Sequence, residues 1–225
     1  KIKKLISALV LGSMLVGLSG CNITDFSAEN LLRPPKAVGD EAEIEQLIAK
    51  TADSGYTLKY PKNGKFRSAI IMTDLDGNDS NEAVAFFRNS AETSSVHMLV
   101  MYSKDNSWEI ASDNIFETTD IDSVDFADLT GNGKAEIIVN STTYTPNVGK
   151  LSCYSYSEGK TNEVGSGQSC SSFVTGDFDN DGTSEIMSLV LYTTENEALA
   201  SMLDYNEDSK SLYAKAMANM DPNVV

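Results

Sequence analysis

Short apolar or β-branched runs, separated by polar and turn-rich loops, recur along the chain from about residue 66 onward. One run stands before and one after each of three acidic loops, and such pairs predict β-hairpins. The six runs are 68–72 and 83–87, 122–126 and 137–141, and 171–175 and 186–190. The second run of each pair is apolar on both faces, which indicates a strand buried between neighbouring sheets.

Two further runs follow each hairpin. The third runs occupy 96–102, 150–156 and 198–205, and the fourth occupy 107–112, 161–166 and 211–216. The pattern therefore predicts an all-β fold built from three units, each with four antiparallel strands in about fifty residues.

The acidic loops themselves repeat. They read TDLDGNDSNE, ADLTGNGKAE and GDFDNDGTSE, at residues 73–82, 127–136 and 176–185. Their leading aspartates lie 54 and 49 residues apart, and each is followed by a glutamate at plus eight and a tyrosine at plus twenty-eight. These residues are Asp74, Glu82 and Tyr102; Asp128, Glu136 and Tyr156; and Asp177, Glu185 and Tyr205. A register kept in three copies indicates a repeat protein.

The loop and the fifty-residue period resemble the FG-GAP/VCBS type of β-propeller blade, which also builds the head of integrin alpha chains. The loop of that family runs D-x-D/N-x-D/N-G-x-x-D and often chelates calcium. The resemblance covers about residues 66–220 and implies a partial β-propeller at 66–225, with blades at 66–116, 117–168 and 169–220. Because a propeller normally closes with four to eight blades, we expect a fragment of a larger ring, and we predict seven blades for the whole.

The first residues are typical of a secretory signal. A basic start precedes an uncharged run at 5–18, which is too short for a bilayer-spanning helix. The ending LSGC resembles the lipobox of bacterial lipoproteins, which implies a signal peptide at 1–20 and Cys21 as the lipidated first residue of the mature protein. Two acyl chains would hold the protein stably at the membrane. Residues 31–50 resemble the leader of uncharacterised Gram-positive lipoproteins that carry such repeats.

Residues 21–65 are expected to form a lipidated tether with a short helix at about 40–51. Asp40 stands at the expected N-cap and Glu43 at the capping-box position. An apolar stripe follows at Ile44, Leu47 and Ile48, and we expect it to pack on the blades.

Alternating carboxylates in a tight loop converge several oxygens on one point, which suits Ca²⁺. The third loop fits best, with a glycine at the expected turn, whereas the first has Asp79 there and the second has only two carboxylates. The candidate ligands are Asp177, Asp179, Asp181, Glu185 and the backbone carbonyl of Thr183; Asp74, Asp76, Asn78 and Glu82; and, more weakly, Asp128, Asn132 and Glu136. The alternative is a plain hairpin loop whose Asp and Asn side chains cap their own backbone amides.

Composition adds a strongly acidic charge. Asp and Glu number 33 against 17 Lys and Arg, which gives a formal net charge of −16. Such a surface repels nucleic acid and anionic lipid and attracts cations. Because no basic cluster appears beyond the first few residues, nucleic-acid binding is not expected.

Few other residues suggest chemistry. His97 alternates with Leu99 and Met101 on one strand face and is interpreted as a structural histidine. Two further cysteines remain, Cys153 in a third strand and Cys170, which is expected in the first strand of the third blade. A disulfide between them is one possibility and two free thiols the other. No nucleophile-elbow, phosphate-loop or zinc signature appears.

These patterns favour a lipid-anchored propeller on the extracytoplasmic face of the cell, acting as a non-catalytic binding or scaffold module. Its partner would be a protein, a cell-wall polymer or another polysaccharide. The alternative is a polysaccharide lyase or hydrolase whose active site lies in missing blades. A solute-binding lipoprotein is disfavoured, because that class alternates strands with long helices.

Overall fold

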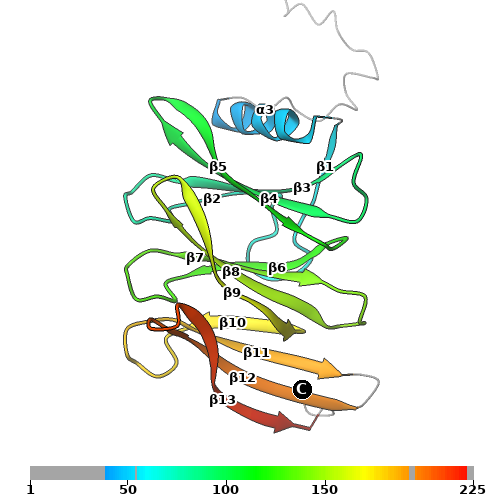
Figure 1. The fold of residues 1–225 in the computed structure, drawn as a ribbon, viewed down its shortest axis with the longest axis vertical. Coiled ribbons are helices and arrows are strands. Elements are labelled where there is room, and N and C mark those ends of the chain that lie inside the picture. The colour runs from blue at the N-terminus through cyan, green and yellow to red at the C-terminus, as the bar shows by residue number, and fades with distance from the viewer. Residues whose placement is uncertain (1–38, 54, 193–195, 222–225) are drawn as a thin grey trace, which may run out of the picture. The chain divides into compact units, whose positions relative to one another are not determined.

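The computed structural model describes residues 39–53, 55–192 and 196–221. Within them the chain forms one helix and thirteen strands, and the strands make three antiparallel sheets (Figure 1). The mostly β architecture predicted from the sequence is confirmed. The predicted signal peptide and Cys21 lie outside the described residues. In the part of the chain that is described, no helix is long and apolar enough to cross a bilayer.

Each sheet contains four strands that follow one another in the chain and pair with their sequence neighbours. The first sheet contains β2 (Ile70–Thr73), β3 (Glu82–Asn89), β4 (Val96–Lys104) and β5 (Ser107–Phe116). The second contains β6 (Ile121–Ala127), β7 (Glu136–Thr142), β8 (Gly149–Ser157) and β9 (Lys160–Cys170). The third contains β10 (Ser172–Gly176), β11 (Glu185–Tyr192), β12 (Glu197–Asn206) and β13 (Ser211–Met220).

The first sheet has an additional short strand that the sequence pattern did not predict. This strand, β1 (Tyr56–Leu58), pairs with the end of β3, where Leu58 lies opposite Phe87. The strand β2 pairs with the beginning of β3, where Ile70 lies opposite Ala85. Two short strands therefore share one edge of β3.

Residues 59–69, which join β1 to β2, leave the first sheet and contact the edge of the second. The backbone N–H of Lys62 donates to the carbonyl of Ile121 at 3.2 Å, and that of Asn63 donates to Asp122 at 2.7 Å. The ring of Phe66 meets Phe126 edge to face, with 4.8 Å between centroids. This segment therefore covers part of the open edge of β6.

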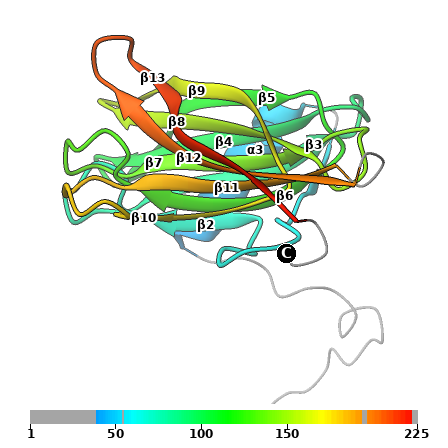
Figure 2. The same ribbon diagram turned by 90° about the horizontal axis from the view of Figure 1, so that it is seen from below.

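The sheets bury their apolar side chains against one another. One cluster joins the first sheet to the second, with Ile71, Val84 and Phe86 among its members from the first sheet and Ile137 and Val139 among those from the second. Another cluster joins the second sheet to the third and includes Leu129, Ile138, Cys153, Ile186 and Leu203. Viewed along this direction in Figure 2, β2 and β10 lie towards one side, and β5, β9 and β13 towards the other.

The helix α3 (Asp40–Ala52) covers the remaining face of the first sheet (Figure 1). Ile44 and Ile48 are buried, and they belong to one cluster with Phe87 and Leu99, as the apolar stripe predicted. The predicted cap is wrong, because the N-cap is Gly39 and no side chain caps the helix. Gly39 takes that place with φ of 64°, so Asp40 becomes the first helical residue, where its charge favours the positive end of the helix dipole.

The two cysteines occupy one hairpin rather than two sheets. Cys170 ends β9, which is longer than expected, instead of standing in the first strand of the third sheet. It lies opposite Gly149, whereas Cys153 lies opposite Gly165. The four-residue offset along β8 corresponds to about 13 Å, beyond the reach of a disulfide, and both cysteines are buried free thiols.

Candidate metal centre

The third acidic loop gathers four carboxylates at the turn between β10 and β11. Asp177, Asp179, Asp181 and Glu185 each offer one oxygen, and these oxygens all lie within 4.8 Å of one another. Asp177 also organises the turn, because its two oxygens accept the backbone N–H groups of Asp181 and Gly182, both at 3.1 Å. A carboxylate has about four lone-pair sites, so these bonds leave capacity for a cation.

The glutamate at plus eight has the same role in all three loops. One oxygen of Glu82, Glu136 and Glu185 accepts the N–H of the residue after the leading aspartate, at 2.8 Å in every copy. All three glutamates are buried. The long arm of glutamate therefore reaches under the loop and closes its base, which explains why this residue recurs.

The other oxygen of this glutamate distinguishes the third loop. Oε1 of Glu185 is buried and has no hydrogen-bond partner among the described residues, and in the first loop the same is true of Oδ1 of Asp76. An unpaired buried carboxylate oxygen is costly, and a cation would satisfy it. Calcium takes oxygen ligands of this kind at about 2.3–2.6 Å. The residues of these two loops could therefore hold a metal ion.

The first loop brings Asp74, Asp76 and Glu82 together within the same 4.8 Å. Burial raises the pKa of Glu82, and the charges of Asp76 and Asp74 raise it further. Burial opposes the shift at Asp74, yet the backbone N–H groups of Asp79, Gly77 and Asn78 lower its pKa overall. The side-chain oxygen of Asn78, a predicted ligand, instead accepts the N–H of Ser80 at 2.7 Å.

Asp79 stands where the other loops have Gly133 and Gly182. Its φ is 64°, against 79° and 95° for the two glycines, so all three residues are left-handed. Aspartate tolerates this region better than most residues. The first loop thus keeps the same turn despite lacking the glycine.

The second loop satisfies itself without an ion. The hydroxyl of Thr130 donates to Oε1 of Glu136 at 3.2 Å, and the backbone N–H of Thr130 donates to Oε2 at 3.2 Å. Asp128 accepts the N–H groups of Asn132 and Gly133 at 3.1 and 2.8 Å, while Asn132 accepts that of Lys134. This arrangement matches the alternative reading, a hydrogen-bonded hairpin loop. Burial raises the pKa of Glu136 first, and the charge of Asp128 raises it further.

A lysine that sequence reasoning missed lies beside the third loop. Lys215, on β13, contacts Asp179 through its Nζ and also binds Asp204 at 2.9 Å. These hydrogen bonds raise the pKa of Lys215. Lys215 is 36 residues from Asp179 in the sequence, so spacing alone does not predict their contact. The pairing of β12 with β13 brings Lys215 near the loop. The ammonium group would compete with a metal ion for Asp179.

Thr183 was predicted to ligate through its carbonyl. Its hydroxyl and its backbone N–H both donate to Oδ1 of Asp181, at 2.5 and 2.8 Å. These two bonds lower the pKa of Asp181. Asp181 is therefore held as a carboxylate, with Oδ1 accepting both bonds from Thr183.

The loops are linked to their neighbours. The N–H of Ala135 in the second loop donates to the carbonyl of Leu75 in the first, at 3.0 Å. The equivalent residue of the third loop, Ser184, donates to Asp128 in the second at 2.8 Å. The acidic loops therefore lie in a row, and each helps to fix the next.

His97 occupies a buried place in β4, away from these loops. Its Nδ1 lies 2.9 Å from Oδ1 of Asp113, and its ring stacks on Phe87 with 4.8 Å between centroids. These contacts are in keeping with the structural role that the sequence pattern indicated.

No family model and none of the curated proteins matches this chain. The chemistry proposed for the loops therefore depends on their own geometry.

Proposed function

We propose that this chain is a lipid-anchored, extracytoplasmic β-propeller module. It binds or scaffolds a partner without catalysing a reaction, and Ca²⁺ stabilises its first and third acidic loops. The partner belongs to the cell envelope, as a protein, a cell-wall polymer or another polysaccharide.

The observation that carries this proposal is the repetition of one inter-sheet interface. In the first sheet Ile71, Leu75 and Val84 face the second sheet, and they are 5%, 0% and 0% exposed. The equivalent residues of the third sheet are Val174, Phe178 and Met187, which are 60%, 42% and 41% exposed. An apolar sheet face of this kind is normally covered, and in this chain the equivalent face is covered by the next sheet. This supports a propeller-type array in which a further sheet of the same repeat covers the third.

The same arrangement supports a binding role. Sheets joined by apolar interfaces and by hydrogen bonds between neighbouring loops make a rigid frame, and functional residues are often carried by loops on such a frame. The acidic surface attracts cations, and weak calcium sites suffice outside the cell, where such modules typically bind with dissociation constants of about 10⁻⁴–10⁻³ M. The lipobox resemblance at Cys21 supports the anchor and its location.

The binding role is tested with the chain carrying Cys21→Ser, which removes the lipidated sulfur. We expect saturable binding to purified wall polymers or to surface proteins of the source cell, with polymer length unchanged on size-exclusion chromatography. Shortening of a polymer by the purified chain would establish the lyase or hydrolase alternative instead.

The anchor is tested separately by labelling cells with a palmitate analogue. The wild-type chain should incorporate the label and partition into detergent, whereas the Cys21→Ser variant should do neither. Equal labelling of both would exclude Cys21 as the lipid site.

A further inference from the structure

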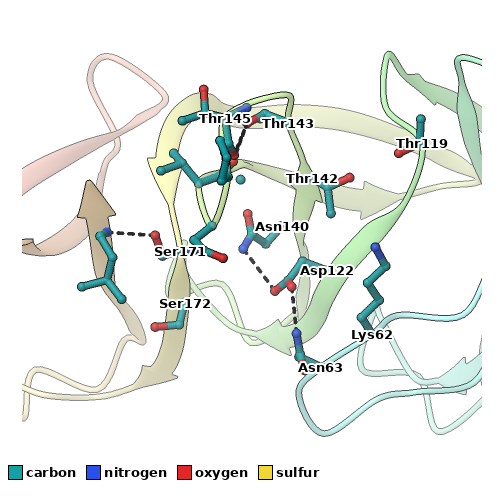
Figure 3. A pocket seen from close by; sticks show the side chains of 15 residues that line it. Lys62, Asn63, Thr119, Asp122, Asn140, Thr142, Thr143, Thr145, Ser171 and Ser172 are labelled. Carbon is teal, nitrogen blue, oxygen red and sulfur yellow. Dashed lines mark hydrogen bonds between the residues drawn. The ribbon is translucent and has the colours of Figure 1, made fainter. Parts of the chain in front are cut away.

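A cavity of about 550 Å³ lies between the second and third sheets, beside residues 59–69 (Figure 3). Its walls come from several separate parts of the chain: the 59–69 segment, the beginning of β6 with the residues before it, the end of β7 with the loop 143–148 and the first residue of β8, and residues at the beginning of the third sheet and near the end of β11. Most of the side chains that line it end in hydroxyl or amide groups. These are Asn63, Thr119, Asn140, Thr142, Thr143, Thr145, Asn147, Ser171 and Ser172.

The polar groups on one side of the cavity are held in place by hydrogen bonds. Asn63 donates to one oxygen of Asp122 at 2.9 Å, and Asn140 donates to the other at 3.4 Å, as the dashed lines in Figure 3 indicate. Asn140 is only 1% exposed. A Cβ at Gly149 would lie 2.2 Å from the side-chain oxygen of Asn140, so a glycine is needed there for this amide to fit.

The loop 143–148 forms another wall and is also fixed. The hydroxyl of Thr143 accepts the N–H of Thr145 at 3.1 Å and donates to the carbonyl of Val148. By contrast, the side-chain hydroxyls of Thr119, Thr145 and Ser172 make no hydrogen bond to any described residue, and all three residues are exposed. These hydroxyls can therefore donate to or accept from a ligand without breaking a hydrogen bond inside the described protein.

A second cavity, of about 520 Å³, lies on the other side of this loop, and Ile115, Tyr144 and Glu163 are among its lining residues. A small cavity of about 30 Å³ shares Thr142 and Thr143 with both of the larger ones. Tyr144, at the loop tip, is 94% exposed. A tyrosine side chain combines an apolar ring with a polar hydroxyl group, which suits a surface that contacts a ligand. The three cavities share the walls formed by this loop, and we call them together the threonine groove.

We propose that the threonine groove binds an uncharged oligosaccharide, with sugar hydroxyls facing the Thr, Ser and Asn side chains and a sugar ring against Tyr144. This inference rests on the proposed binding function and names its ligand class. Hydroxyl and amide groups both donate and accept, as sugar hydroxyls do. The two larger cavities have the size of ligand sites, which span about 300–1,000 Å³, and their extension across the loop favours several sugar units.

Charge argues for a neutral ligand over a polyanion. The charged residues of the first cavity are one lysine and one aspartate, Lys62 and Asp122, and the ammonium group of Lys62 lies 3.2 Å from Asp120. The second cavity likewise has charged residues of both signs in its lining, namely Lys150, Glu117 and Glu163. With a net charge of −16 on the whole chain, a uronate or phosphate polymer would be repelled.

The test is isothermal titration of the full chain carrying Cys21→Ser with three neutral probes and one polyanion. The probes are maltohexaose, cellohexaose and chitohexaose, and the polyanion is polygalacturonate. We expect at least one neutral probe to bind. The double variant Thr119→Val, Thr145→Val removes two free hydroxyls without changing side-chain shape and should weaken binding roughly tenfold.

Two further variants make this test specific. Tyr144→Ala removes a ring that is almost fully exposed, so the fold should be unaffected while affinity falls severalfold. Thr93→Val makes the same threonine change in the equivalent loop of the first sheet, where Thr93 is exposed, and should leave affinity unchanged.

Binding of no neutral probe, or binding that both groove variants leave intact, would overturn the proposal. If the chain then binds polygalacturonate or a surface protein, the binding function survives without the threonine groove. If it binds nothing in either experiment, the proposed function fails as well.

Discussion

The residue two positions after the leading aspartate is a threonine in the second loop and an aspartate in the other two, and between the second and third loops this difference changes what the buried glutamate contacts. In the second loop it is Thr130, whose hydroxyl donates to Oε1 of Glu136. In the third it is Asp179, which has no hydrogen to donate, and Oε1 of Glu185 lacks a hydrogen-bond partner among the described residues. The backbone turn is otherwise alike. A threonine hydroxyl in one loop therefore occupies the role that a cation would have in the other.

This comparison predicts the effect of Asp179→Thr. The wild-type chain should gain about 3–6 °C in melting temperature for each loop that binds calcium at 1 mM Ca²⁺, because a site with a dissociation constant near 10⁻⁴ M contributes about 1.4 kcal/mol. The variant should lose the part of this gain in melting temperature that comes from calcium in the third loop. Without calcium its stability should stay within about 1 kcal/mol of the wild type, since the new hydroxyl can satisfy Glu185 while the partly exposed contact of Asp179 with Lys215 is lost. Differential scanning calorimetry with and without calcium measures both effects.

Thr130→Ser is the matched control, because it keeps a hydroxyl beside Glu136 and should leave the calcium response unchanged. An Asp179→Thr variant that gained as many degrees from calcium as the wild type would place the binding elsewhere.

At the scale of the elements, sequence patterns located long strands well and short or irregular segments poorly. Every strand of the three four-stranded meanders overlaps the run that predicted it, because apolar alternation persists over most of its length; β2 begins two residues, and β10 one residue, after the start of its run. The strand β1 has only three residues, too few for a periodic signal, and its partner β3 supplies the pairing. The segment 59–69 is fixed by the open edge of β6, a tertiary contact that local sequence does not encode.

The same limit explains what was missed in the candidate site. The carboxylates of each loop are close in sequence, so their clustering could be predicted from spacing. The competing ammonium group of Lys215 comes from a strand two positions away in the sheet. The contact of the Thr130 hydroxyl with Glu136 depends on how the glutamate side chain folds under the loop. Neither the Lys215 contact nor the contact between Thr130 and Glu136 can be predicted from the periodicity of the sequence.

The contribution of the helix α3 to the free energy of unfolding can be measured directly. Ile48 is fully buried against the first sheet, so Ile48→Ala should lower the free energy of unfolding by about 2–5 kcal/mol through lost apolar contact and a residual cavity. Gln46→Ala, at an exposed position of the same helix, should change it by no more than about 0.5 kcal/mol. Urea unfolding followed by circular dichroism gives both values. Equal stability of the two variants would mean that the helix does not pack on the sheet in solution.

At the scale of the three packed sheets, the first and the last sheet differ in what covers their outer faces. The face of the first sheet that no other sheet covers carries α3, whose isoleucines fill it. The outward face of the third sheet keeps Val174, Phe178 and Met187 exposed, although the equivalent residues of the first sheet are buried. Repeat arrays need polar or capped ends for solubility. The first sheet is therefore capped by the helix, whereas the outer face of the third sheet carries exposed apolar side chains like those that are buried between the first two sheets.

This asymmetry predicts how the chain behaves when no further sheet covers the third. An apolar-site dye such as anilinonaphthalene sulfonate should bind to the folded chain, and the double variant Val174→Thr, Met187→Thr should bind about half as much. Because both side chains are already exposed, that variant should keep its stability within about 0.5 kcal/mol. The same changes at the equivalent positions of the first sheet, Ile71→Thr and Val84→Thr, bury unpaired hydroxyls and should each cost about 1–3 kcal/mol. If the folded chain bound no dye, or if the two pairs of variants were equally stable, the third sheet would not carry an uncovered interface of the kind that joins the first two.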